Sequence, residues 1–156
     1  MNEEGMGSQT MIHKQRLLLG SDHAGYHMRM TLHAQLVEEN YEVIMFGGTA
    51  PQAVDYPDVV HELLDEFKPE TDRAILLCGS GNGVCMTANH RPGIRAALCW
   101  TKELAILARS HNDAQILCLP ARFITEEDAL EMVRAFLMTD FEGGRHEGRI
   151  RKIERK

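Results

Sequence analysis

The segment Cys78-Gly-Ser-Gly-Asn-Gly83 places a thiol directly before three glycines at alternate positions. Glycines let the backbone approach a ligand closely, and successive N–H groups at the start of a helix bind anions well. The segment lacks the Gly-Lys-Ser/Thr ending of a P-loop, and Val84 stands where the dinucleotide fingerprint has its third glycine. Because a helix N-terminus also favours the thiolate form of cysteine, we interpret the segment as an anion-binding loop with Cys78 as a candidate functional thiol, although a lone cysteine can also be a small buried apolar residue.

The other three cysteines are interpreted as small buried apolar residues. Cys85, Cys99 and Cys118 lie at long and uneven spacings, with no Cys-x-x-Cys pair of the kind found in zinc ribbons and redox motifs. We therefore expect free thiols, as is usual in the reducing cytoplasm.

A second polar cluster follows the first strand-like run. Asp22 has the residue type of a helix N-cap, and capping alone would account for it. His23 comes next and is expected to face the crevice at the carboxyl ends of the strands. His23 and His27 are four residues apart, a spacing found in metal sites, but no third ligand is evident beside them. We therefore expect no metal.

Two further groups lie toward the C-terminus. His111 and Asn112 end a predicted helix, where histidine can complement the helix dipole and asparagine can form the C-cap, so alone they are interpreted as structural. Arg145 and Arg149 are four residues apart and share one helix face, so that with Arg122 they could hold a phosphate bidentately. The alternative is a solvated charged helix that also includes Glu142, Glu147 and Glu154.

The elements that must position these groups are visible as short apolar runs alternating with segments of helical periodicity. The runs predict strands over residues 17–19, 41–46, 74–78, 94–99 and 115–119. The periodic segments predict helices over residues 26–39, 56–67 and 102–109, one opened by Thr125 with a capping box to Asp128, and a charged one over 145–156. This alternation implies parallel strands joined by crossover helices. We therefore predict an α/β fold, a three-layer αβα sandwich around a five-stranded parallel sheet, with ligands at the carboxyl ends of the strands.

Length and composition indicate one domain over residues 16–156, preceded by a polar segment over 1–15 that we interpret as disordered. The 156-residue chain has a formal net charge of −6, so we expect it to bind neither nucleic acid nor an anionic membrane. No leader and no membrane-length apolar run are apparent, which favours a cytoplasmic protein. The last helix has few apolar residues, and we expect it to reach a partner subunit.

Five motifs, taken in order, resemble the ribose-5-phosphate isomerase B family, whose wider group includes the subunits of galactose-6-phosphate isomerase. They are Ser-Asp-His-Ala-Gly (21–25), Asp-Tyr-Pro (55–57), Cys-Gly-Ser-Gly-Asn-Gly (78–83), His-Asn-Asp (111–113) and Gly-Gly-Arg-His-Glu-Gly-Arg (143–149). The resemblance covers nearly the whole chain. It implies a Rossmann-like fold, a homodimer or tetramer with active sites shared between subunits, and no metal or organic cofactor.

The resemblance further implies an aldose–ketose isomerase that interconverts ribose 5-phosphate and ribulose 5-phosphate through ring opening and a cis-enediolate. Cys78 would be the base, His111 would open the ring and Ser80 would help to hold the enediolate oxygens. The other implied residues bind substrate. The enediolate oxygens would be held by the amides of Gly79, Gly81, Asn82 and Gly83, and the sugar hydroxyls by Asp22 and Asn112. The phosphate would be held by His23, Arg122, Arg145 and Arg149, and Tyr56 would line the pocket. Of this set, His111, Asn112 and Arg122 are expected to come from the partner subunit.

Two positions depart from the family pattern. Some members carry serine in place of Cys78 together with a glutamate where this chain has Val84, so this chain is consistent with the cysteine version. Pro120 and Ala121 precede Arg122 where glycine and a small residue are more usual, which stiffens the loop that carries the arginine.

Two other functions stay open. The same proton chemistry would serve allose or galactose 6-phosphate or a tetrose phosphate, because substrate length depends on pocket depth near residues 47–53. A non-catalytic sugar-phosphate sensor is the alternative from another class, although a sensor has no need for Cys78 and His111 together with the arginines.

Overall fold

The computed structural model describes residues 14–155; residues 1–13, most of the predicted extension, and residue 156 lie outside the described part. The described residues include Gln15, whose side chain donates to the carbonyl of Thr71 at 2.8 Å. The carbonyl of Gln15 also accepts from the amide of Glu42 at 3.0 Å. Gln15 is therefore held against the sheet, one residue before the predicted start of the domain.

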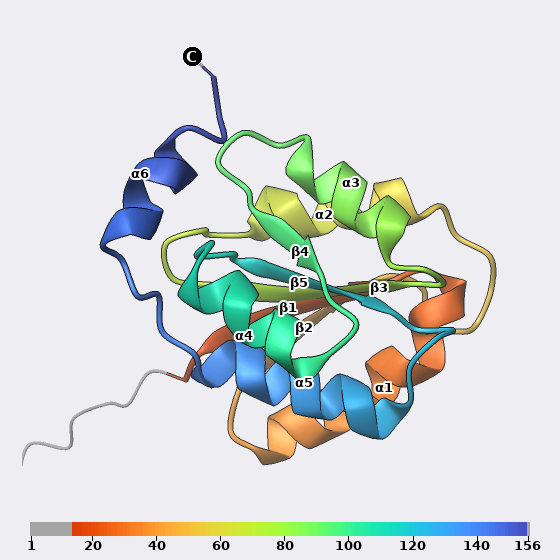
Figure 1. The fold of residues 1–156 in the computed structure, drawn as a ribbon. Coiled ribbons are helices and arrows are strands. Elements are labelled where there is room, and N and C mark those ends of the chain that lie inside the picture. Colours follow the sequence, from red (N-terminus) through yellow and green to blue (C-terminus); the bar gives the residue numbers. More distant parts are fainter. Residues whose placement is uncertain (1–13, 156) are drawn as a thin grey trace, which may run out of the picture.

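Five parallel strands form one sheet, as predicted, and the structure gives their order as β2-β1-β3-β5-β4 (Figure 1). Their continuous apolar runs fit strands that are covered on both faces, and the central leucines of β1 and β3 are fully buried. The bounds are β1 (Arg16–Ser21), β2 (Glu42–Phe46), β3 (Arg73–Cys78), β4 (Ala96–Leu98) and β5 (Ile116–Pro120).

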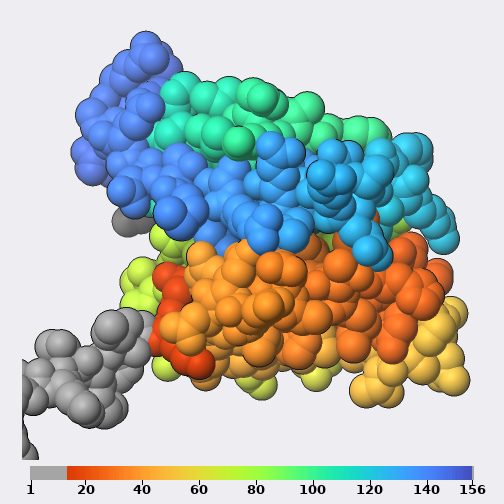
Figure 2. Space-filling model, turned by 90° about the horizontal axis from the view of Figure 1, so that it is seen from below, coloured from red at the N-terminus to blue at the C-terminus, as the bar shows by residue number. Residues whose placement is uncertain are grey.

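Helices cover both faces of the sheet, which confirms the three-layer sandwich. On one face Leu19 packs with Leu32 and Phe136 in a core beneath α1, α4 and α5, the face seen in Figure 2. On the other face Leu18 and Leu63 pack beneath α2 and α3. The helices are η1 (His23–Gly25, a 3-10 turn), α1 (Tyr26–Glu38), α2 (Tyr56–Glu66), α3 (Asn82–Asn89), α4 (Lys102–Ser110), α5 (Glu126–Met138) and α6 (Arg145–Arg151).

The sequence predicts the start of α5 correctly but not the end of α6. The predicted capping box is confirmed at α5, where the Thr125 hydroxyl accepts from the Asp128 amide at 3.0 Å. The last helix is shorter than predicted: it ends at Arg151 instead of running to residue 156. With few apolar side chains to pack, nothing extends it beyond two turns. No helix within residues 14–155 is long and apolar enough to cross a membrane.

The connectivity fixes where a ligand site can form. From β1 the chain crosses to β2 on one side and then to β3 on the other, so the strand order reverses beside β1. In open parallel sheets such a reversal leaves a crevice outside the carboxyl ends of the strands. The ends of β1 and β3 border it, and the amide of Asp22 donates to the carbonyl of Leu77 across it at 3.3 Å.

Candidate functional site

The end of β1 supplies a rigid carboxylate. Asp22 is 8% exposed, and its Oδ1 accepts from the amides of Ala24 at 3.0 Å and Gly25 at 3.3 Å. The predicted cap is thus confirmed, although it caps the 3-10 turn that precedes α1. His23 follows at the same edge with an exposed side chain. Capping fixes the direction of the carboxylate beside the crevice.

The loop after β3 brings a thiol and backbone donors together. Cys78 is 5% exposed, and its carbonyl accepts from the amide of Ala121 at 2.9 Å. Within residues 14–155 the amides of Gly79, Ser80 and Gly81 have no backbone acceptor. Donors of this kind beside a thiol can hold an oxygen that becomes negative while the thiolate takes a proton. The loop therefore has the parts for enolisation chemistry.

Gly81 gives the loop its shape. It precedes α3 with φ at +76°, the left-handed region that favours glycine. A methyl group there would lie 2.5 Å from Cδ1 of Leu98 and 3.0 Å from the carbonyl carbon of Leu119. The loop therefore packs against the ends of both β4 and β5, and only glycine fits.

The substitution Gly81→Ala is expected to lower the free energy of unfolding more than the matched change Gly93→Ala. Gly93 also has a positive φ, +81°, but no atom of the described residues 14–155 lies within 4 Å of a methyl group added there. Gly93→Ala should therefore cost only the conformational term, about 1–2 kcal/mol, and Gly81→Ala roughly 1–3 kcal/mol more from overpacking. Urea denaturation measures both, and equal losses would contradict the predicted packing.

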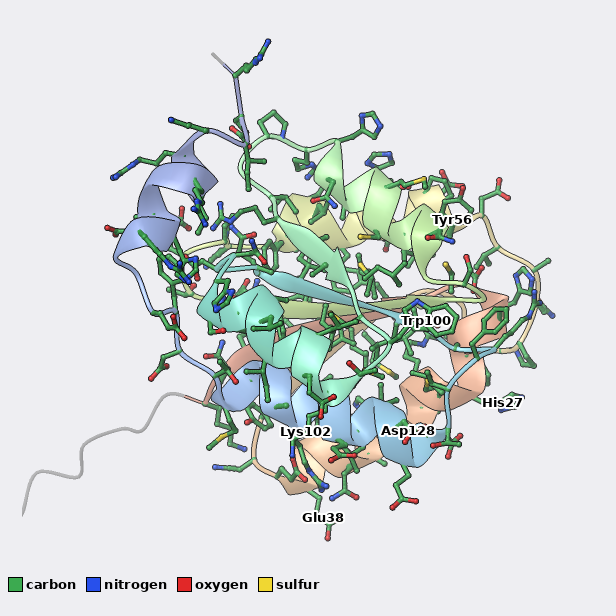
Figure 3. The ribbon with its side chains drawn as sticks, in the orientation of Figure 1. His27, Glu38, Tyr56, Trp100, Lys102 and Asp128 are labelled. Atoms are coloured by element: carbon green, nitrogen blue, oxygen red, sulfur yellow. The ribbon has the colours of Figure 1, made fainter. Side chains whose placement is uncertain are left out.

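Tyr56 and Arg122 stand against the same glycine loop. A methyl group on Gly83 would lie 2.5 Å from Cζ of Tyr56, so the phenol ring lies flat against that backbone. A methyl group on Gly79 would lie 3.2 Å from Nη1 of Arg122. Figure 3 shows Tyr56 at this end of the molecule. Arg122 thus lies beside the loop that follows Cys78 in the same chain, which corrects the expectation that the partner subunit supplies it.

Pro120 does not displace Arg122. The proline is the last residue of β5, buried and in register with Cys78. The amide of Arg122 still donates to the carbonyl of Gly79, at 3.1 Å. Because proline needs no ladder donor at a strand end, the departure is accommodated.

The remaining cysteines lie in or beside the core. The described residues contain four free cysteines, as expected. Cys99 and Cys118 are buried, and burial raises the pKa of both thiols, that of Cys99 to about 12. Cys85 is only half-buried, and its thiol donates to the carbonyl of Ala96 at 3.4 Å. Val84 is fully buried beneath the loop.

His111 and Asn112 lie at the opposite edge of the sheet. Helix α4 runs back against the strands, so its end falls near their amino ends, where Nε of Arg95 donates to the carbonyl of Asn112 at 3.0 Å. His111, and not Asn112 as proposed above, is the C-cap of α4. The left-handed residue is Asp113, with φ at +46°. One chain therefore does not bring His111 to Cys78.

Arg145 and Arg149 share this second edge. The chain that leads to α6 is tied to the end of α4, because the amide of Glu142 donates to the carbonyl of Ser110 at 3.0 Å. Figure 1 shows α6 at the end of the molecule away from the loop between β3 and α3. Both arginines are exposed. The predicted set is thus two half-sites on opposite edges of one chain.

Arg29 was missed by the sequence analysis. It is 2% exposed, and its guanidinium donates to the carbonyls of Phe46 and Gly48, which fixes the loop after β2. Burial lowers the pKa of the Arg29 guanidinium. The available signal was position: residue 29 shares the buried helical stripe of Leu32 and Leu36, where an arginine needs buried partners.

The sequence interpretation placed Glu142 in a solvated charged helix and gave His146 no role of its own. His146 is instead 7% exposed, and its ring stacks on that of His111 with centroids 4.2 Å apart and planes 17° apart. Glu142 places Oε2 3.5 Å from Nε2 of His146. The motif Gly-Gly-Arg-His contained this residue, but only the fold shows what it touches.

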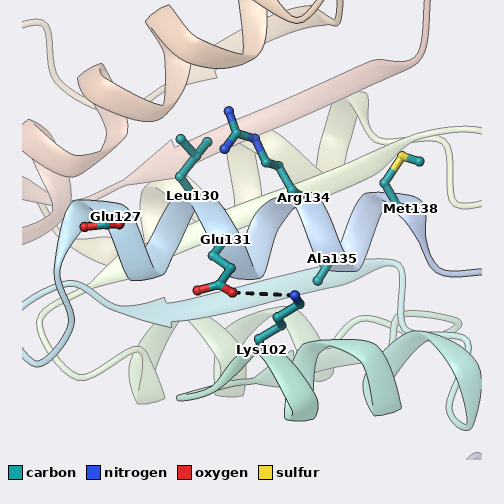
Figure 4. Close-up of a pocket in the computed structure, with 7 residues that line it drawn as sticks. All are labelled: Lys102, Glu127, Leu130, Glu131, Arg134, Ala135 and Met138. Carbon is teal, nitrogen blue, oxygen red and sulfur yellow. Dashed lines mark ion pairs between the residues drawn. The ribbon is translucent and has the colours of Figure 1, made fainter.

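A groove between α4 and α5 is a further candidate site, and its lining argues against a sugar phosphate (Figure 4). Lys102 pairs with Glu131 at 3.5 Å, and Arg134 pairs with Glu39. Both cations are thus already balanced by carboxylates. The groove lies on a helical face and contains no residue of either half-site.

Comparison with known proteins agrees with this geometry. A family model described as "Ribose/Galactose Isomerase" matches residues 17–153. The chain is 37% identical over 139 residues to "Ribose-5-phosphate isomerase B" of Escherichia coli, covering 88% of this chain and 93% of that protein. A ribose 5-phosphate isomerase B structure from Anaplasma phagocytophilum superposes with a TM-score of 0.86 at 41% identity, over 90% of this chain and 97% of that one.

A Mycoplasma genitalium structure is described as ribose-5-phosphate isomerase B with bound ribulose-5-phosphate. It superposes with a TM-score of 0.86 at 39% identity, over 90% of this chain and 95% of that chain. Family model, sequence relatives and solved structures thus agree over nearly the whole described chain. On this evidence the chain belongs to the ribose/galactose isomerase family, with its relatives among the ribose-5-phosphate isomerases B.

Proposed function

We propose that this protein interconverts ribose 5-phosphate and ribulose 5-phosphate. The observation that carries the proposal is the Cys78 thiol at the carboxyl end of β3, directly beside the amides of Gly79 to Gly81, which have no backbone acceptor among residues 14–155. The relative from Mycoplasma genitalium with bound ribulose-5-phosphate supports the choice of a pentose phosphate. A base and an oxyanion cradle together are what an aldose–ketose isomerase requires.

Cys78 moves the proton in this mechanism. The thiolate removes the hydrogen on C2 of the open-chain aldose, and the electron pair shifts to the C1 carbonyl oxygen to give a cis-enediolate. The proton of the C2 hydroxyl passes to the C1 oxygen, and the thiol returns its proton to C1. C1 thus becomes a hydroxymethyl group, and the C2 oxygen becomes the ketone. Ser80 and the amides of Gly79, Gly81, Asn82 and Gly83 hold the charged oxygens.

Ring opening requires a second acid–base group, and His111 supplies it from a second copy of the chain. Cys78 and His111 lie at opposite edges of one chain, so only an oligomer can complete the site. We therefore assign a homodimer, or a tetramer built from such dimers, with sites shared between subunits. Helix α6 reaches the partner in this arrangement.

Substrate binding follows the same division. His23 and Arg122 approach the phosphate from the subunit that supplies Cys78, and Arg145 and Arg149 approach it from the other. Asp22 holds a sugar hydroxyl on one side and Asn112 on the other, while Tyr56 lines the pocket. Arginine pairs suit phosphate because their guanidinium groups can bind two oxygens at once.

An isomerase assay on the purified protein tests the substrate. Ribose 5-phosphate is compared with allose 6-phosphate, galactose 6-phosphate and erythrose 4-phosphate, and we expect the pentose to have the highest kcat/KM. Turnover of another sugar alone would keep the mechanism and change the substrate. Binding of these sugars with no turnover of any would favour the sensor and contradict the proposed function.

A further inference from the structure

The histidine to which ring opening is assigned, His111, is stacked on a second imidazole, that of His146. His146 lies face to face with His111, with ring centroids 4.2 Å apart and planes 17° apart. The Oε2 atom of Glu142 lies 3.5 Å from Nε2 of His146 and 4.0 Å from Nε2 of His111. One carboxylate therefore faces the same edge of both rings.

The fold buries the His146 ring but leaves the His111 ring partly exposed. His146 is 7% exposed, whereas the side chain of His111 is 36% exposed at the end of α4. Glu142 is held at its backbone, whose amide donates to Ser110. The exposed ring thus leans on a buried ring of a separate helix, α6, and its orientation depends on that neighbour.

We propose that His146, with Glu142, is the positioning residue that holds the His111 imidazole in the orientation required for ring opening. The proposal rests on the proposed function, in which His111 acts on the sugar bound to another subunit. A flat neighbour fixes the plane of the His111 ring, and the carboxylate fixes which edge of the ring turns inward. Orientation matters because misplacing a catalytic group by about 1 Å can cost roughly a hundredfold in rate.

The geometry favours positioning over a shared metal ion. The ligand-type atoms of His111, Glu142 and His146 do lie within 4.8 Å of one another. However, imidazole lone pairs lie in the ring planes, and these planes are nearly parallel. An ion placed between the rings would lie off both lone-pair directions, whereas zinc needs each nitrogen directed at it from about 2.0–2.1 Å.

The test compares His146→Leu with the matched variant His146→Phe, which keeps a flat ring. His146→Leu is expected to lower kcat for ribose 5-phosphate about tenfold, and His146→Phe to retain most of it. Glu142→Gln, at an exposed side chain, should cause a smaller loss in the same direction. All assays contain EDTA, and oligomeric state and thermal unfolding are recorded for each variant.

A second readout separates ring opening from proton transfer. Ribulose 5-phosphate cannot form a furanose ring because its C5 oxygen carries the phosphate. Exchange of its C1 hydrogen with deuterium from solvent therefore requires Cys78 and no ring opening. We expect His146→Leu and Glu142→Gln to keep wild-type exchange, which NMR spectroscopy measures.

The outcomes distinguish this inference from the function on which it rests. Unchanged turnover in His146→Leu, or turnover and exchange that fall together, would overturn the positioning role. Equal losses in His146→Leu and His146→Phe would overturn it as well. Absence of both turnover and exchange in the wild-type protein would contradict the proposed function instead.

Discussion

Replacing Cys78 with alanine is expected to lower kcat for ribose 5-phosphate by about a hundredfold to ten-thousandfold, the usual contribution of a general base. The substitution removes one sulfur atom from a site that is 5% exposed and leaves the amides of the glycine loop in place. Substrate binding should therefore persist, and KM should change little. The loss appears in kcat because the thiol acts only on the reacting C–H bond.

Cys99→Ala is the matched control for this experiment. Cys99 is 2% exposed, and burial raises the pKa of its thiol to about 12, so it is neutral at physiological pH. We expect this variant to keep kcat while losing a comparable amount of packing. Thiol alkylation of the wild type should stop turnover through Cys78, and bound substrate should protect it. A Cys78→Ala protein with wild-type kcat would show that another group is the base.

Much of the fold was predictable because its signals are local. Short leucine runs such as residues 17–19, followed directly by glycine or polar residues, are typical of central strands, and the structure buries this run completely. The glycine loop was also predictable, since Gly81 needs a backbone conformation that few other residues adopt. Each of these features depends on neighbours within a few residues.

The division of the site depended on three-dimensional placement. Arg122 is 44 residues from Cys78 in the sequence. Its amide nevertheless donates to the carbonyl of Gly79, the residue that follows Cys78, because β5 lies beside β3. His111 follows Cys78 more closely in sequence but lies at the far edge, because α4 runs back across the sheet. Strand order decides this, and apolar runs alone do not give the order.

Two further residues were missed because their partners are distant in sequence. The stack of His111 and His146 joins α4 to α6, and nothing local to either helix indicates it. Arg29 is buried because the carbonyls of the loop after β2 accept its hydrogen bonds. Polar side chains of this kind are interpreted from sequence as exposed unless a buried partner is known.

The second large effect is expected from His111→Ala, because ring opening on the enzyme is lost. Its kcat for ribose 5-phosphate should fall about a hundredfold or more, while deuterium exchange into ribulose 5-phosphate continues. His111 is half-exposed at the end of α4, so the change should cost little stability. His33→Ala, a histidine on α1 that belongs to neither half-site, serves as the control.

The sharing of sites between subunits is tested most directly by a hybrid of the two inactive variants. Cys78→Ala and His111→Ala chains are co-expressed with different affinity tags, and oligomers that contain both are purified. In each hybrid dimer one site has two defects and the other has Cys78 and His111 both intact. Hybrids should therefore recover roughly half of the wild-type activity per dimer. Hybrids as inactive as either parent would show that Cys78 and His111 do not meet across a subunit interface.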